Sequence, residues 1–451
     1  MNRSASVFRR LFLQSTVLML LFPLLPLSLL ASQPATTLLR LQGSNTINAR
    51  LGPRLVAALL AERGYRDPQV VPTDAMDEWR LTARAPDGTW VAVPIAAHGS
   101  STGFTALAAG TTDLAAASRP INDAEVNALA GLGDLRSKDA EYVIGLDGLA
   151  IIVHPGNSLH ELSLQQLAQV FAGEITDWQQ LGGKPGPIRL YARDDRSGTY
   201  DTFRELVLNP QGKHLNAAAK RYESNEELAQ QVASDPAGIG FTSLAAAAKL
   251  PKLALRDGQG RAIAPSEASI ATEDYPLARR LFLYGPPARR SDWARALLEF
   301  SQTPAGQAVV QQSGFVAQRI EPVKISDTQG MPASYGELAR RAQRLTVNFR
   351  FTAGSAHLDN KALRDVERLA AFMRRPENAQ RQLILVGFND TTEDPARAAL
   401  LARLRANAVA TALRHQKAFA NELLWLGDQL PVAGLSPNGR VKNRRVEAWI
   451  H

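Results

Sequence analysis

The stretch RDDRSGTYDTF, residues 193–203, places hydroxyl side chains and a glycine between two arginines and a helix-like segment. Two earlier stretches have the same character, GSNT at residues 43–46 and GSSTG at residues 99–103. The first N–H groups of a helix lack a partner within the helix and carry the positive end of its dipole, so an oxyanion binds well in front of them. Glycine lets the backbone approach closely, and hydroxyl and guanidinium groups add donors. Together the three stretches predict an anion-binding site.

Each stretch by itself has a simpler interpretation, because Ser and Thr are ordinary N-cap residues of helices. Three such stretches in one chain, one of them containing Arg193, favour a shared anion site over three unrelated caps. The arginine strengthens this interpretation, since its guanidinium offers two parallel donors to one oxyanion.

The order and surroundings of these stretches resemble the phosphate-binding protein of ABC phosphate transporters (PstS-like), a type II periplasmic binding protein with two α/β lobes. The resemblance covers residues 36–318. It rests on LQGSNT (41–46), GSSTGF (99–104), GTTD (110–113), ASRP (117–120), FAGEITDW (171–178), the arginine stretch and GIGF (238–241). Carried over position by position, it implies that the anion contacts Thr46, Ile47, Ser100, Arg193, Ser197, Gly198 and Thr199.

One position departs from that family. Phosphate-binding members carry an aspartate that accepts the proton of a partly protonated phosphate and repels sulfate, whereas here Arg119 follows Ser118. We include Arg119 among the ligand-binding candidates and expect it to remove that discrimination, because specificity depends on repulsion as well as attraction. Phosphate is the favoured ligand, with sulfate or another oxyanion left open. The alternative interpretation of Arg119 is a helix-capping or inter-lobe salt-bridge residue.

The start of the chain has the character of an export signal. Arg9 and Arg10 precede a mostly apolar run over residues 11–30, so we expect a signal peptide at residues 1–32 and a periplasmic protein. An uncleaved inner-membrane anchor is the alternative. The chain has no cysteine and therefore no site for lipoprotein acylation or a disulfide.

The residues that carry hydrolytic or metal chemistry are not arranged for it. The seven histidines are scattered, so we expect no metal site and no cofactor. Ser197 lacks the preceding glycine that a nucleophile elbow requires. We therefore expect no catalytic residue and a protein that is not an enzyme.

Hydrophobic periodicity predicts an alternation of helices and strands, which is typical of an α/β fold. Helices are expected over residues 48–64 and 163–172, and strands over 188–191 and 238–242. Residues 79–97 are expected to form a hairpin that turns at Pro86-Asp87-Gly88. The apolar segment 142–153 is expected to be a strand pair or a strand-turn-strand.

A change of composition separates the C-terminal part. Residues 319–343 are expected to be a linker with a short helix, and residues 344–451 a separate unit. That unit contains 17 Lys and Arg against 10 Asp and Glu, which suits contact with an anionic polymer. The alternative is a solvated arginine-rich surface. No nucleic-acid partner is expected.

The C-terminal unit is predicted to be a small α+β domain with both helices on one face. Its expected order is strand 345–351, helix 359–373, strand 381–387, helix 395–413 and strand 445–450. With VGFND (386–390), LRAN (404–407) and NRRV (443–446), it resembles the peptidoglycan-binding domain of outer-membrane protein A (OmpA-like).

The resemblance implies that Asp390, Arg405 and Asn443 bind peptidoglycan, the first two by holding the diaminopimelate of a stem peptide. Diaminopimelate ends in an ammonium and a carboxylate, so an acid and an arginine together bind both charges. The alternative is a surface ion pair worth about 0 to 1 kcal/mol.

The combined expectation is a periplasmic phosphate or oxyanion binding protein, linked to ABC phosphate transport or sensing and tethered to the cell wall. An ABC transporter permease would be a further partner. Two alternatives remain open at this point. One is a structural envelope protein with a degenerate cleft, and the other is an enzyme that processes phosphoryl groups.

Overall fold

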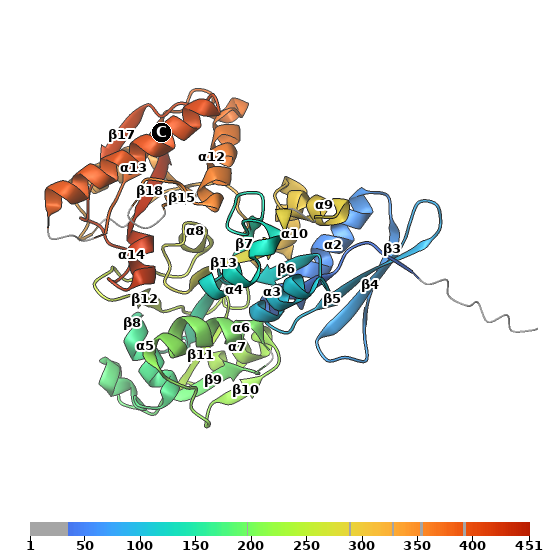
Figure 1. Ribbon diagram of the computed structural model, residues 1–451. Helices are drawn as coiled ribbons and strands as arrows, with labels where there is room; N and C mark the ends of the chain where they lie inside the picture. The colour runs from blue at the N-terminus through green and yellow to red at the C-terminus, as the bar shows by residue number, and fades with distance from the viewer. Residues whose placement is uncertain (1–34, 196, 288–289, 327–328, 352–354, 391–393) are drawn as a thin grey trace, which may run out of the picture. The chain divides into compact units, whose positions relative to one another are not determined.

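The computed structural model describes residues 35–195, 197–287, 290–326, 329–351, 355–390 and 394–451 (Figure 1). The segment expected to be a signal peptide, residues 1–32, lies outside these ranges. Among the helices of the described ranges, none combines the length and the apolar character needed to span a membrane.

The N-terminal region, residues 35–318, is a two-lobed α/β structure on one long mixed sheet (Figure 1). The strand order is β10-β9-β11-β7-β13-β6-β2-β5-β4-β3, and β1 pairs with β5. These strands are β1 (Thr36–Thr37), β2 (Leu41–Gly43), β3 (Arg66–Pro72), β4 (Glu78–Arg84), β5 (Trp90–Ala96), β6 (Leu114–Ala117), β7 (Glu141–Val153), β9 (Arg189–Arg193), β10 (Lys220–Tyr222), β11 (Gly238–Ser243) and β13 (Ala278–Tyr284). A separate two-stranded sheet pairs β8 (Glu161–Ser163) with β12 (Ala254–Arg256).

Helices cover both lobes, each of which has its own apolar core. They are α1 (Asn45–Asn48), α2 (Leu51–Glu62), α3 (Ser100–Ala109), α4 (Asp123–Ala128), α5 (Leu164–Ala172), α6 (Gly198–Phe203), α7 (Asn225–Ser234), α8 (Glu267–Ala271), α9 (Asp292–Phe300) and α10 (Pro304–Gln312). The core of the first lobe includes Leu41, Val93 and Leu283. The core of the second lobe includes Phe171 and Phe203. The expected hairpin is confirmed as β4 and β5.

Strand β7 joins the two lobes. The prediction of a strand pair or a strand-turn-strand over 142–153 is wrong, because Glu141–Val153 is one continuous strand. Its first part pairs with β13 and its last part with β11. Gly145 and Gly148, which favour a turn on sequence alone, serve close packing instead: a Cβ on Gly148 would lie 2.3 Å from Ile270 Cδ1.

The C-terminal region, residues 319–451, contains a second sheet with the order β14-β15-β18-β16-β17. Its strands are β14 (Pro322–Val323), β15 (Gln343–Arg350), β16 (Leu383–Gly387), β17 (Glu422–Trp425) and β18 (Arg445–Ile450). Its helices are α11 (Ala333–Arg341), α12 (Asn360–Met373), α13 (Pro395–His415) and α14 (Pro437–Asn443). The predicted helices and strands are present within a few residues of their expected bounds, while β17 and α14 were not anticipated.

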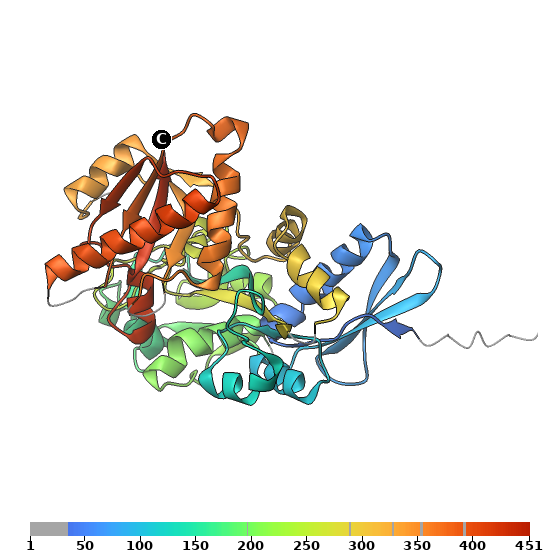
Figure 2. The same cartoon turned by 45° about the horizontal axis from the view of Figure 1, so that its top comes forward.

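Alternate residues of this sheet face different helices. Leu383 and Leu385 pack in one core with α12 and α13, which lie together on one face, as Figure 2 shows in orange. Ile384 and Val386 pack on the opposite face against residues of α11, among them Tyr335. The segment 319–343, expected to be a linker, thus contributes a strand and a covering helix to this sheet.

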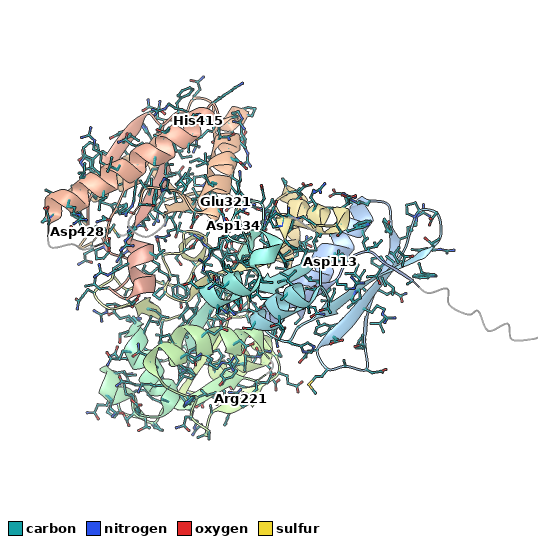
Figure 3. All side chains as sticks on the ribbon, in the orientation of Figure 1. Asp113, Asp134, Arg221, Glu321, His415 and Asp428 are labelled. Carbon is teal, nitrogen blue, oxygen red and sulfur yellow. The ribbon has the colours of Figure 1, made fainter. Side chains whose placement is uncertain are left out.

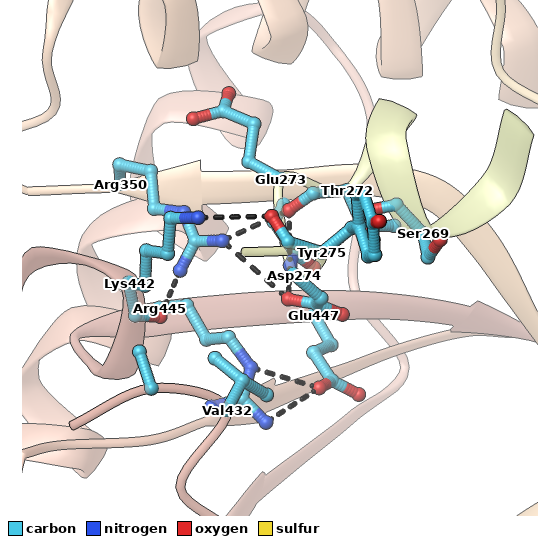
Figure 4. Close-up of polar contacts among 12 residues, drawn as sticks. Ser269, Thr272, Glu273, Asp274, Tyr275, Arg350, Val432, Lys442, Arg445 and Glu447 are labelled. Carbon is cyan, nitrogen blue, oxygen red and sulfur yellow. Dashed lines mark hydrogen bonds and ion pairs between the residues drawn. The ribbon is translucent and has the colours of Figure 1, made fainter. Parts of the chain in front are cut away.

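A buried group of charges joins residues of the two regions (Figure 4). Asp274, which follows α8, accepts hydrogen bonds from Arg344 Nη2 at 2.7 Å, and Arg350 Nη2 lies 3.4 Å from its other oxygen. Lys442 Nζ donates to the carbonyl oxygen of Tyr275 at 2.9 Å. We call this group the junction cluster. Its Asp274, Arg344 and Arg350 side chains are at most 6% exposed, so their charges are compensated almost entirely by the protein.

Candidate functional site

The three glycine and hydroxyl loops lie together. Gly99 N donates a hydrogen bond to Gly43 O at 2.9 Å, which joins the second loop to the first. Thr46 Oγ1 donates to Gly198 O at 3.3 Å, which joins the first loop to the third. The approach of the first and third loops requires glycine, because a Cβ on Gly198 would lie 2.6 Å from Thr46 Cα. Segments that are far apart in the sequence therefore form one site.

The first two loops present backbone and hydroxyl groups. Thr46 lies in α1 at the contact with Gly198, whereas the Ile47 side chain is wholly buried in the core of the first lobe. Ile47 N donates to Ser44 O at 3.2 Å. Ser100 begins α3, and its hydroxyl oxygen accepts a hydrogen bond from Ser118 N at 3.1 Å. Ser100 is thus fixed at the helix start by the end of the β6 segment.

The third loop is held by its own cap and by β10. Ser197 is the N-cap of α6 and accepts from Thr199 N at 3.2 Å. Arg193 donates through Nη2 to Glu223 O at 2.6 Å, and burial lowers the pKa of its guanidinium. Arg221 of β10, labelled in Figure 3, lies with Cζ 4.3 Å from the ring centroid of Tyr200 in α6. These contacts hold the third loop against β10.

Arg119 forms an ion pair within the first lobe. Its Nη2 lies 2.7 Å from Glu125 Oε1, and its Nη1 lies 2.9 Å from Glu125 Oε2. Nη2 also donates to Ser101 Oγ at 2.8 Å. The hydrogen bond with Glu125 raises the pKa of Arg119. Glu125 also belongs to the capping box of α4, so Arg119 supports that cap through an ion pair that lies within one lobe and not between lobes.

The residue that sequence analysis missed is Arg279 of β13. Its side chain is 6% exposed and donates through Nη2 to Thr46 Oγ1 at 2.8 Å and to Gly198 O at 3.3 Å. Nε donates to Asp147 Oδ2 at 3.2 Å and Nη1 to Glu205 Oε2 at 2.9 Å. An arginine within the apolar strand ARRLFLY was the available signal, since a buried charge requires partners. The partners of Arg279 depend on the register of β13 against β7, which the sequence alone does not give.

In the C-terminal region, Asp390 follows β16 and is held by two arginines. Arg444 Nε lies 3.0 Å from Oδ1, and Arg440 Nη1 lies 3.0 Å from Oδ2. Burial opposes ionisation, but the hydrogen bonds from Arg444 and Arg440 outweigh it and lower the pKa of Asp390. The carboxylate is therefore ionised and fixed in direction.

Arg405 of α13 lies near this carboxylate, in a buried position. Its Nη1 donates to Asn389 Oδ1, and its Nε lies 3.4 Å from Ser355 O. Burial lowers the pKa of Arg405 to about 10; the charge of Arg444 adds to this effect and that of Asp390 opposes it. The acid and the base named by the sequence analysis thus lie within each other's field.

Asn443 has a different setting. Its side chain is wholly buried, and its Oδ1 accepts from Val432 N at 2.8 Å and from Ala433 N at 3.1 Å. Its Nδ2 donates to Ala433 O at 2.8 Å. The amide therefore shapes the 432–433 loop and has its hydrogen bonds satisfied by the chain.

Neither site offers an arrangement for a metal ion. Across the ranges given above, no three His, Asp or Glu side chains gather in a way that could hold one. The chemistry available at both sites is hydrogen bonding and ion pairing.

Two lobes on a shared sheet, with three donor loops meeting between them, define a solute-binding protein. Residues 72–304 match the family model described as a PBP superfamily domain, which spans more than half of the chain, and the chain belongs to that superfamily. Residues 350–445 match the model of the OmpA family.

The N-terminal region is similar in sequence to curated proteins and in fold to solved structures. The chain is 32% identical over 239 residues to protein SphX of Synechococcus elongatus, covering 50% of this chain and 68% of that protein. It is 28% identical over 228 residues to the phosphate-binding protein PstS of Staphylococcus haemolyticus, covering 49% of this chain and 70% of that protein. A solved ABC-type phosphate transport receptor from Vibrio cholerae is 20% identical with a TM-score of 0.48, covering 62% of this chain and 99% of that one.

Proposed function

We propose that this chain binds inorganic phosphate, or a closely related oxyanion, where its three loops meet. The observation that carries the proposal is the contact of Thr46 with Gly198, since it brings donors from both lobes to one point. Binding between lobes encloses a ligand and replaces its water shell with fixed donors, which is how small-solute sites gain specificity. The ligand contacts are proposed for Thr46, Ser100 and Thr199, with Ile47 and Gly198 contributing through the backbone.

The relatives support this ligand. The name of the Staphylococcus haemolyticus relative states that it binds phosphate, and it does not describe an enzyme. The site accordingly binds its ligand without a chemical step. Arg193 and Arg119 are both engaged by the chain, Arg119 by a carboxylate, so phosphate selection rests on the geometry of the donors more than on an uncompensated cation.

We propose further that the C-terminal region holds the protein at peptidoglycan in the cell envelope. The fixed carboxylate of Asp390 suits the ammonium group of diaminopimelate, and the guanidinium of Arg405 suits its carboxylate. Asn443 supports this site by shaping the loop at 432–433. A permease of an ABC transporter is the proposed partner of the N-terminal region, and a signal peptide at residues 1–32 the proposed means of export.

Calorimetric titration of the full exported chain, stripped of ligand by unfolding and refolding, tests the first proposal. Saturable phosphate binding at one site is expected, with sulfate as the comparison. Absence of heat and of thermal stabilisation with either anion would contradict the proposal and favour a structural envelope protein. Release of phosphate from a phosphomonoester would instead favour an enzyme.

Sedimentation with purified peptidoglycan tests the second proposal independently of the first. The wild-type chain is expected to sediment with the sacculi, and free diaminopimelate is expected to compete. Equal sedimentation of Asp390→Ala and Arg405→Ala variants would remove the tether from this site.

A further inference from the structure

Arg279 stands out because it is a buried charge on a strand that is otherwise largely apolar. It belongs to β13, directly opposite Asp147 of β7 in the strand register. Both side chains are at most 10% exposed. A buried guanidinium and carboxylate are retained at a net cost unless their geometry is good, so a role beyond stability is a reasonable expectation for such a pair.

The guanidinium of Arg279 is fixed on two sides by carboxylates. Its Nε donates to Asp147 at 3.2 Å and its Nη1 to Glu205 at 2.9 Å. Thr202 Oγ1 lies 3.1 Å from the same Asp147 oxygen. The third nitrogen, Nη2, donates to Thr202 Oγ1 and also faces the first and third loops. Its direction is set by the two carboxylates, because a guanidinium is planar and rigid.

That nitrogen meets both loops at once. Nη2 donates to Thr46 Oγ1 at 2.8 Å, and it lies 3.3 Å from Gly198 O. A hydroxyl has one proton and two lone pairs. Because Arg279 occupies a lone pair of Thr46, the hydroxyl proton must be directed elsewhere, and in this structure it is directed to Gly198 O. An oxyanion is a stronger acceptor than a peptide carbonyl.

Arg279 also affects the carbonyl group of Gly198, by reducing its repulsion of an anion. Its oxygen carries partial negative charge and lies at the start of α6, where an anion is expected. Hydrogen bonds from Arg279 Nη2 and from Thr202 Oγ1, the latter at 2.8 Å, offset that charge. One guanidinium thus orients a donor toward the site and weakens the repulsion from an acceptor beside it.

We propose that Arg279 is a positioning residue of the oxyanion site, acting through Thr46 and Gly198 and held by Asp147 and Glu205. This inference rests on the proposed function and adds to it the group that sets the direction of the donors. Arg279 lies beside the two carboxylates of Asp147 and Glu205, so these three side chains together carry no net positive charge. Arg279 therefore acts by orienting hydrogen-bond donors and not by attracting the anion. A lysine keeps the charge but lacks the planar fork.

The test is a double-mutant cycle on the full exported chain, with phosphate titrated by calorimetry. Arg279→Gln is expected to raise Kd by about 10- to 100-fold, the range of a lost charge-assisted hydrogen bond. Thr46→Val is expected to raise it similarly. In the Thr46→Val background, Arg279→Gln is expected to add about threefold or less, because the group through which it acts is already gone.

Two further variants separate positioning from stability. Arg279→Lys keeps a cation beside Asp147 and is expected to fold, yet to lose most of the affinity. Arg364→Gln removes another buried guanidinium, one that donates to Glu141 O at 2.9 Å outside the site, and is expected to leave Kd within about twofold.

The outcomes are distinct. The positioning role would be overturned if Arg279→Gln lowered phosphate affinity equally in the wild-type and Thr46→Val backgrounds, or if Arg279→Lys kept wild-type affinity. Either result would leave phosphate binding itself established. A wild-type chain that binds neither phosphate nor sulfate would overturn the proposed function, and this inference with it.

Discussion

Two neighbouring arginines of β13 have the same chemistry and different surroundings. Arg279 faces the first and third loops, where Thr46 Oγ1 and Gly198 O accept from it. Arg280 donates through Nη1 to Asp359 at 2.7 Å and through Nε to Glu273 at 3.0 Å, on the side of the junction cluster. Burial lowers the pKa of Arg280, but the charges of Asp359 and Glu273 outweigh it and raise the pKa. The strand thus carries one cation toward each environment.

The difference lies in what accepts the hydrogen bonds. Around Arg280, carboxylates of the chain accept the hydrogen bonds, whereas in the junction cluster the carboxylate of Asp274 shares them with backbone carbonyl oxygens such as that of Tyr275. Arg279 directs one nitrogen to a hydroxyl and a carbonyl, and the hydroxyl of Thr46 retains a proton that an oxyanion could accept. The two arginines of β13 therefore differ in their acceptors, which are carboxylates for Arg280 and include a hydroxyl and a carbonyl for Arg279.

The largest effect is expected from breaking the junction cluster. Arg344→Met leaves the carboxylate of Asp274 with a buried charge that is only partly compensated, and removing one partner of a buried pair costs about 3–5 kcal/mol. Unfolding in urea would measure the loss. Arg341→Gln is the control, because its pair with Glu422 is exposed and worth about 0–1 kcal/mol. Equal losses for the two variants would contradict the comparison.

Acid should weaken the ion pairs of Glu273 with Arg280 and Lys361, beside the junction cluster, by a somewhat smaller amount. Burial by itself would raise the pKa of the Glu273 carboxyl group. The charges of Arg280, Lys361 and Arg350 outweigh burial and lower this pKa to about 2 from an ordinary 4.5. A folded-state pKa below the unfolded value stabilises the fold above the unfolded pKa, and this contribution is lost as pH falls from about 4.5 toward 2. The expected loss is on the order of 2–3 kcal/mol.

The measurement is the free energy of unfolding against pH, with Glu273→Gln as the comparison. The variant is expected to be less stable at neutral pH and to show a shallower decline in acid. Parallel curves for the two proteins would show that Glu273 does not carry this pH dependence.

A third effect is expected at Asp390, whose carboxylate accepts hydrogen bonds from Arg440 and Arg444. Asp390→Asn keeps the shape and removes the charge that would hold an ammonium group. Affinity for a diaminopimelate-containing muropeptide should fall by about 10- to 100-fold, the value of a charge-assisted hydrogen bond. Titration with a lysine-containing stem peptide is the control for charge selectivity. Unchanged muropeptide affinity would place binding elsewhere.

The sequence predicts well what depends on local pattern. Helices α12 and α13 and the hairpin of β4 and β5 have their signals within the segment, as periodicity or as a turn. Strand β7 is different. Whether Gly145 and Gly148 bend the chain depends on Val310 and Ile270, whose side chains fill the space beside them. Packing from distant segments therefore decides a feature that looks local.

The site shows the same limit. The loops were identifiable because glycine and hydroxyl residues mark them in the sequence. The pairing of Arg279 with Asp147 joins residues 132 positions apart and follows from the register of β13 on β7. The role of Asn443 was hidden for a similar reason, since its partners at 432–433 belong to a loop without a distinctive pattern.

The smallest effect is expected at Arg119, where sequence comparison predicts the loss of discrimination between phosphate and sulfate. In the structure its charge is matched by Glu125, with both contacts at or below 2.9 Å, and its nitrogens also donate to Ser101 Oγ and Pro120 O. A cation that is already paired exerts a weak field on a nearby anion, because the carboxylate opposes it. Arg119→Gln should therefore change the ratio of phosphate to sulfate affinity by about threefold or less.

The ratio is measured by titrating each anion into the full chain. Glu125→Gln is the companion variant, because it leaves the charge of Arg119 uncompensated and should favour the more highly charged anion. A large change in the ratio for Arg119→Gln alone would mean that this arginine, and not the donor geometry set from β13, selects the ligand.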